Sequence, residues 1–106
     1  MKIIDFRFRP NTPEIINGIK NSSMFKATCE AIGFDKRVPQ PLPEIVADLD
    51  RRGVELCVVS GRDCETTYGF PANNNSILEF CRAYPNKFLG FWGIDPHKGM
   101  DAVREV

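Results

Sequence analysis

The strongest constraint on the fold of this chain is an alternation of strand-length apolar runs with amphipathic helical stretches. Residues 54–59 form a nearly continuous apolar run, which is typical of a parallel strand buried on both faces. An amphipathic stretch at 43–52 precedes it, and a second such stretch at 74–84 and a second apolar run at 88–94 follow. Buried strands separated by helices predict an α/β fold with a parallel sheet and right-handed crossovers.

The N-terminal segment, residues 2–8, alternates in the way that a strand does, and Pro10 ends it. This alternation predicts two faces, one with Ile4, Phe6 and Phe8 and the other with Ile3, Asp5, Arg7 and Arg9.

Further helices are predicted from a cap and from apolar spacing. One begins at Pro13, with Thr12 as its N-cap. The apolar stripes of two others are Phe25, Cys29 and Ile32 within 23–32, and Met100, Val103 and Val106 at the end of the chain.

A sheet of this kind belongs either to an open doubly wound fold or to a barrel. A doubly wound nucleotide site needs a glycine-rich turn after its first strand, but Arg9-Pro10-Asn11 stands there. We therefore predict a partial (β/α)8 TIM barrel, with about three parallel strands alternating with helices. A complete barrel needs roughly 250 residues. We therefore expect residues 1–106 to form a single domain, the N-terminal part of such a barrel.

Charge and composition exclude several classes of partner. Basic and acidic residues number 14 each, so the zero net charge gives no electrostatic reason to expect a nucleic acid or an anionic membrane. No apolar stretch reaches the ~18 residues of a membrane helix, and no signal peptide is visible. The four cysteines form no C-x-x-C pair, so we expect reduced thiols in a cytoplasmic protein.

Three stretches, taken together, resemble a known enzyme family. Residues 3–10, Ile-Ile-Asp-Phe-Arg-Phe-Arg-Pro, are similar to the first strand of the amidohydrolase-2 group, which includes decarboxylases related to aminocarboxymuconate-semialdehyde decarboxylase. Residues 42–61 resemble the group's helix, glycine turn and apolar strand. Residues 84–96 resemble the Tyr-Pro-x-Lys/Arg-Phe stretch that leads into its third strand. The resemblance therefore spans nearly the whole chain.

This resemblance implies a metal-dependent hydrolase or non-oxidative decarboxylase, with zinc or another divalent metal as cofactor. In that family two first-strand histidines bind the metal, but Arg7 and Arg9 stand at these positions here. A guanidinium group is cationic and has no lone pair to donate. We therefore expect no cofactor for this chain, assign no catalytic residue, and expect it to be inactive as an enzyme.

The candidate site is a group of arginines at the carboxyl ends of the strands, which form the active-site face of a barrel. Arg7 and Arg9 end the first strand and Arg62 follows the second, so they are placed to hold a small carboxylate or phosphate. The competing interpretation makes each arginine a rim cation that pairs with an acid such as Asp5, Asp63 or Asp95.

Weaker site candidates lie on the same face. Asp63 follows the second strand, and Asp95 and His97 follow the third. Acids after strands also cap helices, and His97, the only histidine, is better explained as a surface loop residue.

Three functions remain open. The chain is a partial amidohydrolase-family protein, or a non-enzymatic module that binds a small anion through Arg7, Arg9 and Arg62, or a barrel piece that assembles with itself. Three parallel strands leave open edges and an apolar sheet face, which favours a homo-oligomer or the missing half of the barrel as partner.

Overall fold

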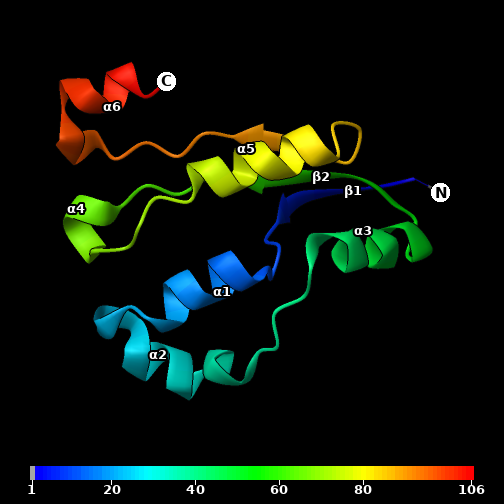
Figure 1. Ribbon diagram of the computed structural model, residues 1–106, viewed down its shortest axis with the longest axis horizontal. Helices are drawn as coiled ribbons and strands as arrows, with labels where there is room; N and C mark the ends of the chain where they lie inside the picture. The colour runs from blue at the N-terminus through cyan, green and yellow to red at the C-terminus, as the bar shows by residue number, and fades with distance from the viewer. Residues whose placement is uncertain (1) are drawn as a thin grey trace.

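The predicted strands form one parallel sheet in the order β1-β2-β3 (Figure 1). The structure, a computed structural model, describes residues 2–106. Its strands are β1 (Ile3–Phe8), β2 (Val54–Ser60) and β3 (Phe88–Phe91). Both neighbouring pairs are parallel, so all three strands end at the same edge of the sheet.

Helices separate the strands, as the periodicity predicts. The α-helices are α1 (Pro13–Lys20), α2 (Lys26–Ala31), α3 (Leu42–Arg51), α4 (Glu65–Tyr68), α5 (Asn74–Ala83) and α6 (Met100–Arg104). Short 3-10 turns lie at η1 (Ser23–Phe25), η2 (Phe34–Lys36) and η3 (Pro96–Lys98). The helices predicted at 43–52 and 74–84 are thereby confirmed as α3 and α5.

The core lies between the sheet and the two crossover helices, α3 and α5. Its buried residues are Ile45, Val46, Leu49, Cys57, Val59, Ile77, Phe80 and Phe88. Strands that follow one another in order, with right-handed crossovers, place both helices on the same face. The molecule measures 41 × 35 × 20 Å, and its short dimension matches a sheet with one layer of helices. The α/β class is therefore confirmed, and closure into a barrel stays a prediction.

The first strand is irregular between Asp5 and Phe8, and this changes which face its side chains occupy. Asp5 pairs with Cys57 and Phe8 with Val59, so both lie on the helix-covered face of the sheet. Phe8 also stacks on Phe88, with ring centroids 6.2 Å apart. The prediction that Phe8 shares a face with Ile4 and Phe6 is therefore wrong, because the irregularity reverses the alternation.

The same irregularity affects the two arginines at the end of β1. Asp5 and Phe8 both lie on the helix-covered face with two residues between them, so alternation no longer assigns a face to Arg7. Arg9 follows the strand, and both arginines are exposed. The prediction that they share the face of Asp5 rested on an unbroken alternation that β1 does not have. In a barrel with helices outside, the uncovered face is the interior.

Three local predictions are wrong or only partly met. Thr12 precedes α1 but makes no side-chain cap, and its buried Oγ1 has no hydrogen-bond partner among the described residues. The stretch predicted at 23–32 divides into η1 and α2, where Cys29 is buried but Ile32 is exposed. In α6 the predicted stripe faces solvent and Ala102 is buried instead.

Candidate functional site

The carboxyl edge of the sheet is formed by the loops after the three strands, residues 9–12, 61–64 and 92–98. Figure 1 shows α4 and α6 beyond this edge, at the left of the view. Five of the six predicted site residues lie in these loops, and Arg7 lies near the end of β1, because parallel strands deliver their following loops to one side.

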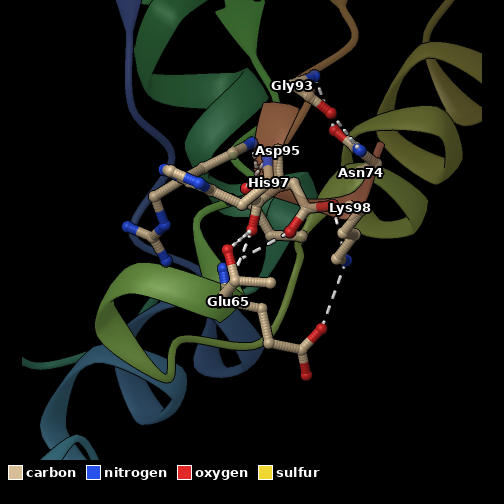
Figure 2. Close-up of polar contacts among 10 residues, drawn as sticks. Glu65, Asn74, Gly93, Asp95, His97 and Lys98 are labelled. Carbon is tan, nitrogen blue, oxygen red and sulfur yellow. Dashed lines mark hydrogen bonds and ion pairs between the residues drawn. The ribbon is translucent and has the colours of Figure 1, made fainter. Parts of the chain in front are cut away.

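Asp95 fastens the loop after β3 to helix α4. Its side chain is 1% exposed, and its Oδ2 accepts hydrogen bonds from Thr66 Oγ1 at 2.6 Å and Thr66 N at 3.0 Å (Figure 2). Its Oδ1 accepts from His97 N at 3.0 Å, which caps η3. The Thr66 hydroxyl is the main cause that holds the pKa of Asp95 below its usual value, against the effect of burial. Asp95 is thus an ionised structural cap.

Asp63 is also engaged inside the protein. Its side chain is completely buried, and its Oδ2 accepts a hydrogen bond from Lys98 Nζ at 2.7 Å. Lys98 reaches Glu65 as well, at 3.3 Å (Figure 2). The contact with Asp63 is the main cause that raises the pKa of Lys98 above its usual value. Lys98 therefore stays cationic and neutralises Asp63.

Asn74, at the start of α5, fixes the backbone after β3. Its Nδ2 donates to Gly93 O at 2.7 Å, and its Oδ1 accepts from Gly93 N at 2.8 Å (Figure 2). The last ladder bond runs from Gly61 N to Phe91 O at 2.7 Å. The buried side-chain amide of Asn74 therefore takes the place of strand β2 as the hydrogen-bond partner of Gly93. This explains why β3 ends at Phe91, whereas the sequence predicted a strand that continues to Ile94.

Arg62 stacks on an aromatic pair. Its guanidinium carbon lies 4.6 Å from the ring centroid of Phe70, and Phe70 stacks in turn on Phe25 at 4.5 Å. The Arg62 Nε is buried without a hydrogen-bond partner among the described residues. The guanidinium is thus held by cation–π contact and keeps unused donor capacity.

Arg7 and Arg9 are exposed at the end of β1. Within residues 2–106 neither they nor Arg62 form an ion pair with an acid. Asp5, their nearest acid in sequence, accepts a hydrogen bond from the backbone N of Arg7 at 3.0 Å. The interpretation that these arginines pair with Asp5, Asp63 or Asp95 is therefore wrong for residues 2–106, where Asp63 and Asp95 have other partners and no ion pair joins an arginine to Asp5.

The residues that organise the edge were only partly predictable. His97 contributes its backbone N–H to Asp95, while its side chain is exposed, as the surface interpretation expects. Sequence reasoning missed Lys98, Thr66 and Asn74. Lys98 and Thr66 meet partners 35 and 29 positions away, and no local pattern signals such pairs. The asparagine run before α5 was the one available signal for Asn74.

These residues do not fit the zinc site that the family resemblance implies. Arginine has no lone pair for a metal, and the one histidine is exposed. Across residues 2–106, no three His, Cys, Asp or Glu side chains lie together in a way that could hold a metal ion. The described chain also contains no helix long and apolar enough to cross a membrane.

Comparisons with protein-family models, with curated proteins and with solved structures returned no match to this chain.

Proposed function

We propose that this chain binds a small carboxylate or phosphate at the carboxyl edge of its sheet, through Arg7 and Arg9 with help from Arg62. One observation carries the proposal: these three cations have no acidic partner within residues 2–106, although two acids lie at the same edge. Those acids are buried and satisfied by Lys98, Thr66 and His97. Among residues 2–106 the three arginines are therefore left without an ion-pair partner.

The chemistry of the arginines suits such a ligand. A guanidinium offers planar paired donors that match two oxygens of a carboxylate or phosphate, and these charge-assisted hydrogen bonds are stronger than neutral ones. Arg7 and Arg9 lie two residues apart at the end of β1, and both are exposed. Arg62 follows the neighbouring strand β2, and its stacking on Phe70 limits its conformational freedom before any ligand binds.

We also keep the amidohydrolase-2 group as the proposed ancestry, and a partial TIM barrel as the proposed architecture. The order β1-β2-β3 and a single helical layer support this, because both occur in a segment of a (β/α)8 barrel. The arginines occupy the positions at which the resemblance expects metal ligands. The proposal is therefore binding without turnover by this chain, and a cytoplasmic location in keeping with four free cysteines.

Titration of the ¹⁵N-labelled chain with inorganic phosphate at low ionic strength, followed by NMR chemical shifts, tests the binding site. We expect a saturable response at residues of the carboxyl edge. Arg7→Gln and Arg9→Gln should each weaken binding about tenfold or more, the loss of one charge-assisted contact. Added salt should weaken it further because the arginines are exposed.

Arg52→Gln is the matched control. Arg52 is exposed at the end of α3 and precedes β2, so it lies at the amino edge of the sheet, away from Arg7 and Arg9. It forms no ion pair within the described residues. Its loss should leave the phosphate affinity unchanged. Equal weakening by Arg52→Gln and Arg9→Gln would show general charge attraction and overturn the assigned site, as would a titration without saturation.

A further inference from the structure

The face of the sheet opposite α3 and α5 carries uncovered apolar side chains. We call this the open face and define it by Ile4, Phe6, Leu56, Val58, Leu89 and Phe91. The strand register places Ile4 beside Leu56 and Val58 beside Leu89 on one side, and Phe91 lies beside Ser60 on the same side. Phe6 directly follows the helix-facing Asp5 and is assigned to this side by its alternation with that residue. Ile4, Phe6, Leu89 and Phe91 are 58, 76, 50 and 53% exposed. Such exposure is unusual because parallel sheets are normally covered on both faces.

Val58 lies at the centre of the open face. It is buried, yet it lies outside the core cluster between sheet and helices. The large side chains on the neighbouring strands of the same face are exposed, so the apolar surface that a partner can cover lies around Val58.

The size of the open face fits a protein partner. Its exposed side chains present on the order of 500 Å² of apolar surface, in the upper part of the range for a monomer. A standard interface buries roughly 800 Å² on each partner, including its polar rim. With a polar rim around it, the face is therefore large enough for a specific interface.

Charge favours a second copy of this chain as the occupant. The residues that define the open face carry no charge, and the net charge of zero removes long-range repulsion between copies. Arg7 and Arg9 flank the face only at its carboxyl end. A two-fold arrangement with strands running in opposite directions keeps the two arginine pairs at opposite rims, whereas parallel strands would bring them together.

We propose that two copies of this chain pack their open faces together as a two-fold dimer, with the strands of the copies antiparallel across the interface. An isologous contact of this kind closes on itself and leaves a layer of helices on each outer side. The arginines remain at the rim and accessible. This inference does not rest on the proposed anion binding.

Light scattering after size-exclusion chromatography tests the dimer over a wide range of protein concentration. The expected mass is twice the 12.0 kDa of the chain. Phe6→Glu places a charge in the middle of the face and should give a monomer with unchanged circular dichroism. Val38→Glu is the matched control, because Val38 is 80% exposed but lies in the connector before α3, and this variant should stay dimeric.

Each outcome decides the proposal. A wild-type chain that is monomeric at all concentrations, or that forms larger assemblies, overturns it, and so does a Phe6→Glu variant that remains dimeric. If Phe6→Glu fails to fold, Leu89→Glu on the opposite edge strand gives the same decision. The phosphate titration on the Leu89→Glu variant separates the two proposals, since its new charge lies on the edge strand away from Arg7 and Arg9 and anion binding should persist there.

Discussion

At the scale of single residues, burial decides which charged groups remain available for a ligand. Asp63 and Asp95 are removed from solvent and fully engaged by their partners. Arg7 and Arg9 are exposed and form no ion pair within residues 2–106. The charged residues of the carboxyl edge therefore have different roles. The buried aspartates hold the loops in place, whereas the exposed arginines can exchange water for an external anion.

Cys57 gives a residue-scale prediction for the pH dependence of stability. Burial, helped by the negative charge of Asp5 and opposed by Lys87, raises the pKa of this thiol from 9.0 to about 11. The unfolded thiol loses its proton near 9.0 while the folded thiol keeps it. The free energy of unfolding should therefore be unaffected below pH 9.0 and fall by on the order of 2 kcal/mol as the pH rises to about 11.

Urea denaturation of the wild type and of Cys57→Val across this pH range measures the effect. Valine keeps an apolar side chain in the core and removes the titration, so the loss of stability in alkali should be smaller in the variant. Tyrosine and lysine titrate equally in both proteins and cancel in the comparison. Parallel pH profiles for the two proteins would contradict the role assigned to Cys57.

At the scale of elements, the close approach between the backbones of the loops after β2 and β3 depends on two glycines, Gly61 and Gly93. A Cβ on Gly93 would lie 2.6 Å from Gly61 O, which is backbone and has little room to move. Gly93→Ala should therefore lower the free energy of unfolding by ~1–3 kcal/mol, the usual cost of overpacking. Thermal unfolding followed by circular dichroism measures this loss.

Gly18→Ala is the control for the glycine prediction. Gly18 lies within α1, and a Cβ there meets no atom within 4 Å. Alanine favours helix over glycine, so this variant should gain ~0.5–1 kcal/mol. A Gly93→Ala protein as stable as the Gly18→Ala protein would show that the two loops do not meet closely.

The elements that sequence predicted well are those with a complete periodic pattern of their own. The spacing of apolar residues in α3 and α5 and the apolar run of β2 indicate their structure without reference to partners. The sequence-based prediction failed where a contact with another part of the chain determines the course or the end of a strand. The irregularity of β1 follows from its pairing with β2, and β3 ends early because Asn74 takes the next backbone groups.

The sequence could predict where in the fold the candidate site lies, but not which residues form ion pairs and hydrogen bonds there. Strand order alone brought Arg9, Arg62 and Asp95 to one edge, because parallel strands end together. Which acid meets which cation depends on contacts between distant loops. Lys98, which neutralises Asp63, therefore could not be identified from the chain.

At the scale of the whole molecule, the chain forms two layers: a sheet with one face covered by helices, and an open face on the other side. The helix-covered face holds the core, and the open face ends at the arginines of the carboxyl edge. In a barrel the open face would be the interior and the edge would be the mouth. The three proposals therefore involve adjoining surfaces. The dimer uses the open face, the anion site uses the carboxyl edge, and the partial barrel would make these its interior and its mouth.

The central claim is that the carboxyl edge binds anions and is not a metal site. Isothermal titration calorimetry of the full chain, with phosphate and separately with zinc, tests it most directly. We predict saturable phosphate binding and no stoichiometric zinc binding, because arginines offer donors and no lone pairs. Sub-micromolar zinc binding that is lost in His97→Ala, together with no heat from phosphate, would contradict the claim.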